Sequence, residues 1–303
     1  MWWSAQGGST SVATLNFGTS NSGTATLRSV TTTSLLNSSR RLGFVTATTA
    51  NSSAGTRHNL LQFFISSSNV NYGGFLYVAR FAPSSNGTVA TQRSFVGLLS
   101  SVSLIGGSGG ALGNTDPSLI PQMVGFGYDA ADTQWYFMNS GNTTTGTFTA
   151  SVSGFVLTVT AATGTLGLRK PLTHTVGLAV GTAIISFGTG TGGVGTYNLN
   201  ISQTCASGTL TQYADSTKTA ILDTLPPRGN TDVFEARIYS APGSNVVGYS
   251  LEDLSAGLLV EGFVDSNLPT NTLLAPQIWT CNGTGASAAA AIDVMTQYIE
   301  TDF

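Results

Sequence analysis

The sequence predicts an all-β protein, a jelly-roll-like β-sandwich with a small inserted β domain. Short apolar or alternating runs recur between clusters of Gly, Asn, Ser and Pro, which is the pattern of strands joined by turns. No long segment shows the apolar period of a helix. Charged residues make up only 8% of the chain, and Ser, Thr, Asn and Gly, which favour strands and turns, supply the remaining polarity.

The first part of the chain contains the early strands of the expected sandwich. The apolar runs are VATLNF (12–17), RLGFVTA (41–47), LLQFFI (60–65), GGFLYVARF (73–81), SFVGLL (94–99), MVGFGYD (123–129) and TQWYFMN (133–139). Strands at this spacing, separated by turn-forming residues, are typical of a sandwich or a barrel.

The composition changes between about Thr147 and Thr211. This stretch has no acidic residue, and Arg169 and Lys170 are its only Lys or Arg residues. Its expected strands are GFVLTVTA (154–161), TVGLAV (175–180), AIISFG (183–188) and YNLNIS (197–202). A shift of this length predicts a separate Gly/Thr-rich β module over 147–211.

Charged residues return after this module, and further strands follow. The expected strands are DVFEARIYSA (232–241), NVVGYSLEDL (245–254), GLLVEGFV (257–264) and AAIDVMTQYIETDF (290–303). Neither flanking part supplies a full two-sheet core by itself. We therefore expect one sandwich of the lectin-like, jelly-roll kind, formed by 1–146 and 212–303 and interrupted by the module at 147–211. Three domains in series is the alternative.

Residues 183–199 contain a glycine pattern that resembles a nucleotide-binding loop. Gly188, Gly190 and Gly193 have the spacing G-x-G-x-x-G after an apolar run. The dinucleotide fingerprint requires a helix directly after the glycines, so that the helix N-terminus faces the pyrophosphate. The following residues alternate as a strand does. We therefore expect a β-hairpin with a long glycine turn and no bound nucleotide.

Charge and hydropathy exclude several partners. The net charge is −3, and eleven Lys and Arg spread along the chain provide no basic surface for nucleic acid. No apolar stretch approaches the roughly 18 residues of a membrane span, so no membrane insertion is expected. The first residues lack the basic and apolar segments of a signal peptide. Cys205 and Cys281 fall in different expected domains, which favours free thiols over a disulfide.

Several stretches are similar to a known family. The resemblance to tailed-bacteriophage virion proteins of the tail-fibre kind rests on MWWSAQGGSTSVATLNFG, SAGTRHNLLQFF, GGFLYVARFA, QRSFVGLL, TLLAPQIW and, most specifically, GFGYDAADTQWYFMNSG and YIETDF. It covers nearly all of 1–140 and 217–303. In relatives, the equivalent of WYFMNSG runs almost directly into a segment like TKTAILDTLP, which supports an insertion. The module resembles a small β module of phage and bacterial surface proteins, whose glycine hairpin implies no nucleotide.

This resemblance implies a non-enzymatic virion structural protein, assembled in the host bacterial cytoplasm, that serves as a tail or receptor-binding fibre component contacting the host surface. Family fibres are commonly homotrimers. The expected partners are therefore further copies of the chain, with a trimer favoured, other virion proteins and a host cell-surface glycan. A capsid or head-fibre decoration protein without a receptor role and a glycan-depolymerising tailspike are the alternatives. No cofactor is expected.

Candidate catalytic acids are few. A glycosidase requires two carboxyl groups about 5–10 Å apart. The candidate pairs are Asp129 with Asp132, Glu252 with Asp253, and Glu300 with Asp302. Asp129 and Asp132 flank a turn, where Asp is common for structural reasons. Glu252 and Asp253 are adjacent, and on a strand their side chains point to opposite faces. We therefore expect no catalytic residue, although the first pair remains the candidate for the depolymerase alternative.

The histidines and cysteines give no metal or nucleophile motif. His58 and His174 fall in different expected domains, and no G-x-S-x-G elbow precedes a helix. Neither histidine lies at a metal-ligand spacing from a cysteine in the sequence. We therefore expect no metal site.

Glycan binding is the remaining candidate activity. Aromatic rings with nearby amides and carboxylates are the groups that bind sugars, because sugar C–H faces stack on π-systems. The candidate glycan-binding residues are Tyr128, Asp129, Trp135, Tyr136, Asn139 and Trp279. On one strand, Trp135 and Phe137 share a face and Tyr136 lies on the other, so at least one set belongs to the core. Loop tips, including 141–146 and the module, are the alternative positions.

Overall fold

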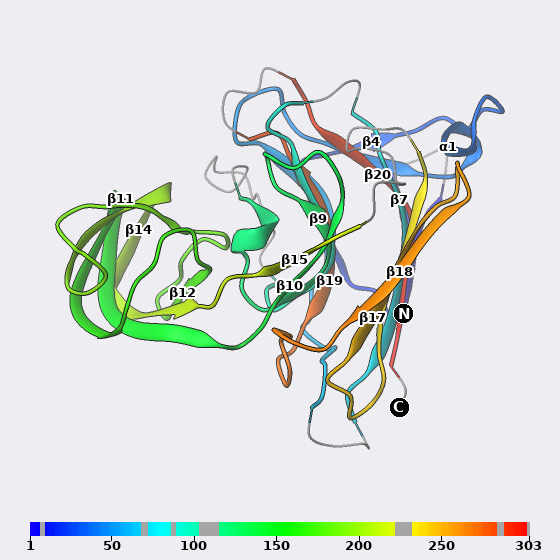
Figure 1. Cartoon of the computed structure of the whole chain (residues 1–303). Helices are drawn as coiled ribbons and strands as arrows, with labels where there is room; N and C mark the ends of the chain where they lie inside the picture. Colours follow the sequence, from blue (N-terminus) through cyan, green and yellow to red (C-terminus); the bar gives the residue numbers. More distant parts are fainter. Residues whose placement is uncertain are drawn as a thin grey trace.

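The computed structural model describes residues 1–6, 10–67, 72–85, 89–102, 115–221, 232–283 and 288–301. Two seven-stranded antiparallel sheets face each other, and a four-stranded sheet forms a separate body beyond one of them (Figure 1). Helical structure in these residues is limited to α1 (Leu35–Ser38) and the 3-10 turn η2 (Pro117–Leu119). The predicted β-sandwich with an inserted β domain is confirmed.

We call the two sheets of the sandwich sheet A and sheet B. Sheet A has the order β18 (Leu258–Val264), β17 (Val247–Asp253), β16 (Phe234–Ser240), β7 (Phe75–Pro83), β20 (Ala291–Glu300), β5 (Leu42–Val45), β4 (Thr24–Leu27). Sheet B has the order β15 (Thr217–Ala220), β10 (Tyr136–Ser140), β9 (Met123–Tyr128), β8 (Arg93–Leu99), β19 (Ala275–Cys281), β6 (Ser53–His58), β3 (Thr19–Ser22). A hairpin of β1 (Trp2–Ala5) and β2 (Val12–Leu15) lies beside the end of β20, where the Met1 amine donates to the Ile299 carbonyl at 2.6 Å.

Alternation along each strand places the core between the two sheets. In β9, Val124, Phe126 and Tyr128 belong to the main core, while Gly125 lies on the outer face of sheet B. A Cβ added to Gly125 would lie 2.7 Å from Cζ of Phe95, so the missing side chain lets that ring lie against the outer face. Burial alternates in the same way along β16, as the period-two pattern of 232–241 predicts.

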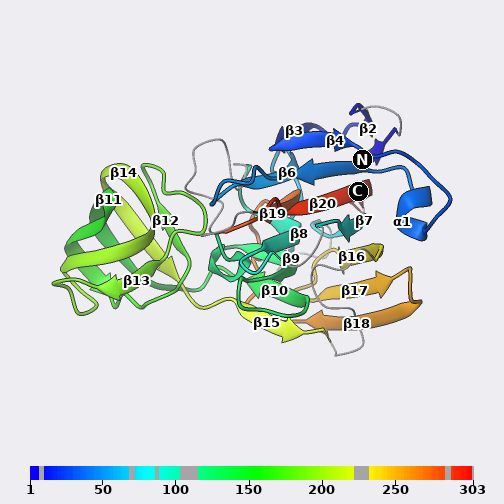
Figure 2. The ribbon, with the colours of Figure 1, turned by 90° about the horizontal axis from the view of Figure 1, so that it is seen from above.

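The inserted module has its own sheet and its own core. Its strands are β11 (Thr144–Gly164), β12 (Leu172–His174), β13 (Ile184–Phe187) and β14 (Gly195–Tyr213). A cluster of buried apolar side chains lies within it, separate from the core of the sandwich. The module begins three residues earlier and ends two residues later than the expected 147–211. It lies beyond sheet B, on the side away from sheet A (Figures 1 and 2).

The module leaves the sandwich and returns to it at one place. β10 and β15 are paired neighbours in sheet B, with Asn139 opposite Thr217. A few residues further on, Thr144 at the start of β11 is opposite Tyr213 at the end of β14. The module therefore takes the place of the turn between two paired strands and leaves the order of sheet B intact.

The glycine-rich segment forms a hairpin. β13 and β14 pair antiparallel, with Phe187 opposite Tyr197, and a strand rather than a helix follows the glycines. The Tyr197 hydroxyl donates to the Gly193 carbonyl at 2.6 Å, which brings the turn over the ring. A Cβ added to Gly190 would lie 2.4 Å from Cζ of Tyr197. Glycine is therefore needed here for close packing on a tyrosine ring, not for the approach of a phosphate.

Two strand predictions were wrong. Residues 60–65 form no continuous strand, because Phe63 and Ile65 make only isolated bridges and enter the core from an irregular segment. Residues 175–180 form turns after β12, with Gly177 at φ 96. A short apolar run does not distinguish a strand from a buried irregular segment. Strands were also missed: β3 and β6 were not predicted, because their sequences TSNS and SAGTRH are polar.

Candidate functional site

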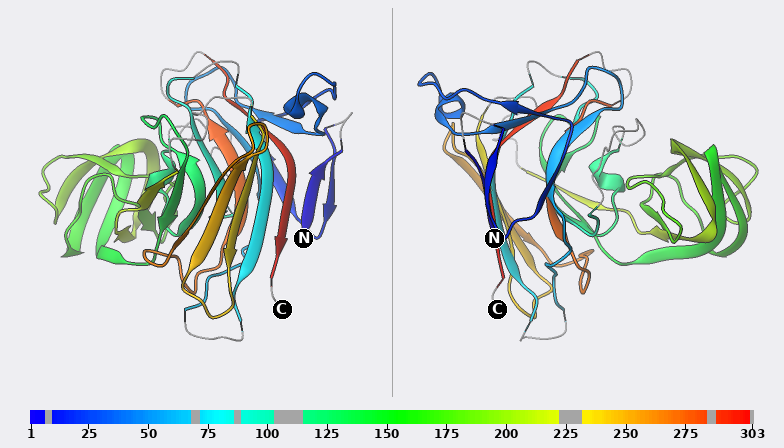
Figure 3. Two further views of the ribbon diagram at one scale, coloured as in Figure 1. Left: turned by 45° about the vertical axis from the view of Figure 1, so that its right-hand side comes forward. Right: turned by 180° about the vertical axis from the view of Figure 1, so that it is seen from behind.

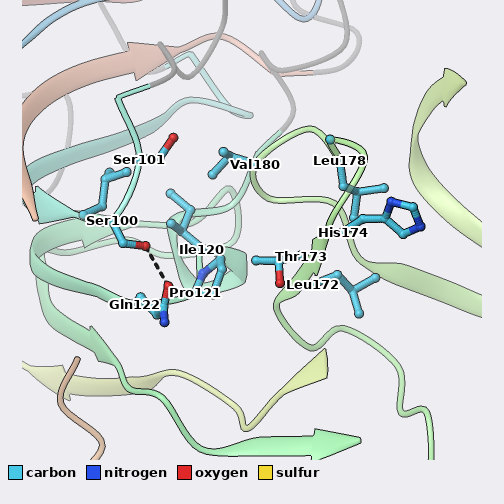
Figure 4. A pocket seen from close by; sticks show the side chains of 12 residues that line it. Ser100, Ser101, Ile120, Pro121, Gln122, Leu172, Thr173, His174, Leu178 and Val180 are labelled. Atoms are coloured by element: carbon cyan, nitrogen blue, oxygen red, sulfur yellow. Dashed lines mark hydrogen bonds between the residues drawn. The ribbon is translucent and has the colours of Figure 1, made fainter. Parts of the chain in front are cut away.

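The contact between the sandwich and the module forms a partly open pocket of about 240 Å³ (Figure 4). One hydrogen bond joins the two bodies beside it, from the Thr115 hydroxyl to the Val180 carbonyl at 3.3 Å. The segment that returns from the module is fixed by the Ser216 hydroxyl, which donates to the Ser118 carbonyl at 2.5 Å. The cavity is lined from the sandwich by Leu99, Ser100, Ser101, Ile120, Pro121 and Gln122, and from the module by Leu172, Thr173, His174, Gly177, Leu178 and Val180.

The sandwich side of the cavity is built on an unusual backbone position. Gln122, directly before β9, has a positive φ of 54, which is uncommon for a residue with a side chain. Its carbonyl accepts from the Ser100 backbone amide at 3.0 Å, and its side-chain oxygen accepts from the Ser100 hydroxyl at 2.9 Å. Its amide nitrogen donates to Asn142 Oδ1 at 3.1 Å, on the segment that leads into the module. These bonds offset the strain and fix the amide at the cavity wall.

His174 supplies the only titratable side chain in this lining, and neither ring nitrogen is available for proton transfer. Nε2 lies 3.0 Å from the Ala150 carbonyl, and Nδ1 accepts from the Val176 backbone amide at 3.2 Å. The Nδ1 contact assigns the ring proton to Nε2, which donates to Ala150. With apolar side chains, hydroxyls and an amide as the remaining lining, the cavity can bind a small uncharged group but provides no acid or base.

A cysteine lies directly behind His174. Cys205 Sγ is 3.1 Å from His174 Nδ1 and 2.9 Å from the Gly177 carbonyl. Spacing along the sequence did not reveal this pair, because 31 residues separate His174 from Cys205. The two residues come together only through the pairing of β12 with β14. Burial raises the pKa of the Cys205 thiol, so the sulfur stays protonated and donates a hydrogen bond. Among the described residues, no three His, Cys, Asp or Glu side chains gather as a metal site would require.

The acidic turn between β9 and β10 forms a second polar cluster near the module. Lys218 of β15 places its Nζ 3.1 Å from Asp129 Oδ2 and 2.5 Å from Asp132 Oδ2. Asp129 also accepts from the Ser118 amide at 3.1 Å and the Ser118 hydroxyl at 2.6 Å. Burial, followed by the charge of Asp116, raises the pKa of Asp129 despite these favourable contacts.

This cluster ties the turn to its neighbours. The Asp132 carboxylate accepts from the Asp129 backbone amide at 2.7 Å, as in an ordinary Asp turn. The Lys218 amine, which lies between the two carboxylates, is also 4.6 Å from the centre of the Tyr136 ring. A glycan-cleaving pair needs one carboxyl group to protonate the leaving oxygen and the other to face the sugar. Here the two acids share one lysine, which gives them a structural role.

The other candidate acids among the described residues, and His58, are also held in structural contacts. Asp253 accepts from the Ser255 and Ala256 backbone amides at 2.8 and 3.1 Å. Glu252 lies 3.6 Å from the Arg237 guanidinium. Glu300 accepts from the Tyr298 hydroxyl, and Asp302 lies outside the described residues. His58 is buried, with its ring nitrogens 2.9 Å from the Gly18 carbonyl and 3.0 Å from Gln62 Oε1.

The six predicted glycan-binding residues do not form one site. The side chains of Tyr128, Trp135, Asn139 and Trp279 are buried, so they have no surface to present to a ligand. Tyr128 and Trp135 pack edge to face in the main core, with ring centres 4.8 Å apart. Tyr136 and Asp129 remain partly exposed, on opposite sides of the Lys218 amine.

Asn139 and Trp279 are buried by different contacts. The Asn139 amide donates to the Ser266 and Asn267 carbonyls at 2.9 and 2.8 Å. Trp279 lies on the outer face of sheet B and stacks on Phe95 with ring centres 6.1 Å apart. Strand parity correctly separates Trp135 and Phe137 from Tyr136, and the structure shows that the first two are the core set.

Comparison with known proteins adds a likeness of fold. The sequence matches no model of a known protein family and no curated protein. Arcelin-5, a lectin-like defence protein from Phaseolus vulgaris, aligns with 95% of this chain and 94% of its own at 8% identity and a TM-score of 0.43. Lectin II from Ulex europaeus aligns with 94% of this chain and 93% of its own at 12% identity and a TM-score of 0.44. Likeness at these levels assigns neither a family nor a ligand.

Proposed function

We propose that this chain is a non-enzymatic structural protein of a bacteriophage virion, a tail or receptor-binding fibre component that contacts the host surface. The observation that carries the proposal is the position of the module. It replaces one turn of an intact sandwich, has its own core and projects away from the rest of the molecule (Figure 2). The similarity of the flanking sequence to tail-fibre proteins supports the virion assignment.

The module offers an exposed surface for contact around the paired strands β11, β14 and β13. Cross-strand pairing places Val156 of β11 opposite Asn198 of β14, and Asn198 opposite Ser186 of β13. Exposed apolar side chains gather around this level and the neighbouring glycine turn: Phe155, Val156, Ile185, Phe187 and Val194. Exposed apolar side chains grouped in this way are typical of a binding surface.

The engagement of the candidate catalytic groups described above supports a binding role. Both nitrogens of His174 in the cavity are engaged, and Asp129 and Asp132 share the Lys218 amine. The depolymerase alternative would have to use these same acids. A decoration protein without a receptor role remains the other alternative, and it predicts a chain that does not bind host cells.

A deletion of the module tests the proposal directly. Removing 147–211 joins Gly146 to Gln212, which are cross-strand partners, so the remaining strand ends can close through a short turn. We would label the full chain and this deletion variant and measure by flow cytometry how they decorate a panel of bacterial strains. Binding by the full chain that is lost in the deletion variant supports a receptor-binding module. No binding by a folded full chain favours the decoration alternative.

A single substitution provides a matched control for the deletion. Val194→Asp places a charge in the exposed glycine turn of the module, and Leu15→Asp places the same charge on the exposed β1–β2 hairpin of the sandwich. We expect Val194→Asp to weaken cell binding and Leu15→Asp to leave it unchanged. Equal effects of the two substitutions would contradict binding through the module.

A further inference from the structure

The outer face of sheet A presents aromatic rings that none of the interactions described above use. Phe263 of β18 is 70% exposed, Tyr239 of β16 is 50% exposed and Tyr298 of β20 is 37% exposed. This face points away from the module (Figure 1), and β16, β17 and β18 lie open toward the viewer in Figure 3, left. We call Phe263, Tyr239 and Tyr298 the aromatic platform.

The register of sheet A aligns two of these rings in one row. Phe263 is opposite Gly248, and Gly248 is opposite Tyr239. A Cβ added to Gly248 would lie 2.2 Å from Cζ and 2.5 Å from Oη of Tyr239. The Tyr239 ring therefore lies over the glycine, toward Phe263, and half of it is exposed to solvent.

The third ring continues the platform across the sheet. Tyr298 lies two strands beyond Tyr239 and one outward-facing position along, opposite Val78 of β7. Its hydroxyl donates to Glu300, two residues further on the same face, so its ring lies along β20. Strands in a sheet are about 4.8 Å apart, which places the backbone positions of Phe263, Tyr239 and Tyr298 about 10 Å or slightly more from one to the next, while the Tyr239 ring itself leans toward Phe263. This spacing suits an extended ligand with several ring-sized units.

The charges on this face decide between possible occupants. The two arginines of the face, Arg80 and Arg237, both bind the Glu235 carboxylate, and Arg237 also approaches Glu252. No ion pair to a cation is formed by Glu261 or Glu300 within the residues that the structure describes. Around the rings, the face therefore carries two carboxylates that can accept hydrogen bonds, while Arg80 and Arg237 are already paired. Among the described residues, Arg40 is a further cation of this region, and it lies beside Arg80 and Thr296.

These charges argue against a second copy of the chain on this face. A two-fold contact brings the same surface of both copies together, so Glu261 and Glu300 of each copy would meet a surface whose Arg80 and Arg237 are already engaged with Glu235. Anionic polymers are repelled for the same reason. A ligand that donates hydroxyl groups and stacks its C–H faces on aromatic rings has no such cost.

We propose that the aromatic platform binds an extended polysaccharide of neutral sugars. The rings stack on sugar faces, and the Glu261 and Glu300 carboxylates accept hydrogen bonds from sugar hydroxyls. This proposal rests on the proposed function, because it assumes that the protein meets a glycan-covered surface. It names the chemical class of the ligand and assigns it to a face remote from the module.

Affinity electrophoresis of the full chain tests the platform. Native gels would contain neutral glucans, mannans or galactans, or the polyuronate alginate as the anionic comparison. We expect at least one neutral polysaccharide to retard the protein and alginate not to retard it. Tyr239→Ala and Phe263→Ala should each weaken binding about tenfold, since one stacked ring contributes about 1.4 kcal/mol, which is a factor of ten in affinity.

Two variants control for indirect effects. Tyr239→Phe keeps the ring over Gly248 and should bind as the wild type does. Leu60→Ala removes an equally exposed apolar side chain just after β6 of sheet B, outside the platform and the module, and should also leave retardation unchanged. Thermal unfolding of each variant establishes that it is folded.

Three results would contradict the proposal. The first is that no neutral polysaccharide of the panel retards the protein, and the second is equal retardation of the Tyr239→Ala variant and the wild type. The third is a light-scattering mass that falls when Phe263 is replaced by alanine. The last result would show that the face joins copies of the chain. Cell binding that depends on the module, together with no polysaccharide retardation, would remove the platform and leave the proposed function standing. Polysaccharide retardation of a chain that binds no cells would support the platform and contradict the proposed function.

Discussion

Replacing Lys218 by methionine should destabilise the protein, and the loss should be larger at neutral pH than in acid. The Lys218 amine is the shared counter-ion of Asp129 and Asp132, whose side chains are 14% and 12% exposed. Removing one partner of a fully buried ion pair costs about 3–5 kcal/mol. The lysine side chain is 27% exposed, and Ser118 still donates to Asp129, so we expect a smaller loss of about 2 kcal/mol.

The dependence on pH follows from the direction of the pKa shifts. Burial, followed by the charge of Asp116, already raises the pKa of Asp129, and loss of the Lys218 charge would raise this pKa further. An acid whose pKa is higher in the folded state than in the unfolded state destabilises the fold above the folded-state pKa. This penalty disappears as pH falls through that pKa toward the unfolded value. The deficit of the variant should therefore be largest near neutral pH and shrink in acid.

Thermal unfolding followed by circular dichroism at pH 7 and pH 4.5 measures both effects. A loss of about 2 kcal/mol corresponds to a Tm lower by about 5 °C for a domain of this size. The control is Lys170→Met, because Lys170 lies 3.3 Å from Asp215, whose side chain is 68% exposed, and such surface pairs contribute about 0–1 kcal/mol. An unchanged Tm of the Lys218 variant at pH 7, or a deficit that grows in acid, would refute the reasoning.

Three further predictions concern the module, the thiols and assembly. Gly190→Ala forces a Cβ against the Tyr197 ring and should speed hydrogen exchange of backbone amides within 144–213 but not in sheet A, because the module has a separate core. Burial raises the pKa of Cys281 to about 12 and also raises that of Cys205, so neither thiol should react with Ellman's reagent at pH 8 until the protein unfolds. Light scattering should give three times 31.1 kDa, about 93 kDa, and a monomeric mass would contradict the proposed homotrimer.

Much of the fold could be predicted because burial follows strand parity. The alternation in 232–241 predicts which side chains of β16 face the core, and the runs at 94–99 and 123–129 match β8 and β9 closely. The run at 60–65 misled because Phe63 and Ile65 are buried without belonging to a continuous strand. A run of apolar residues predicts that a segment is buried. It does not predict whether the backbone of that segment pairs with a neighbouring strand.

The candidate sites were harder to predict because their residues come together through strand pairing over long sequence distances. Lys218 is 89 residues from Asp129, with the whole module between them. His174 and Cys205 meet only because β12 pairs with β14. The candidate glycan-binding aromatic residues were selected by residue type, since the sequence does not show which rings are exposed. Tyr128 and Trp135 proved to be core side chains, whereas Tyr239 and Phe263 are exposed on a sheet face.

The single point of attachment makes the module exchangeable. Gly146 and Gln212 are cross-strand partners, and paired residues in antiparallel strands lie about 5 Å apart. Any folded unit whose two ends lie that close together could occupy the same position without stretching β10 or β15 apart. A lineage carrying this sandwich could therefore acquire a different inserted domain in one recombination event, while the strand order of the sandwich stays unchanged.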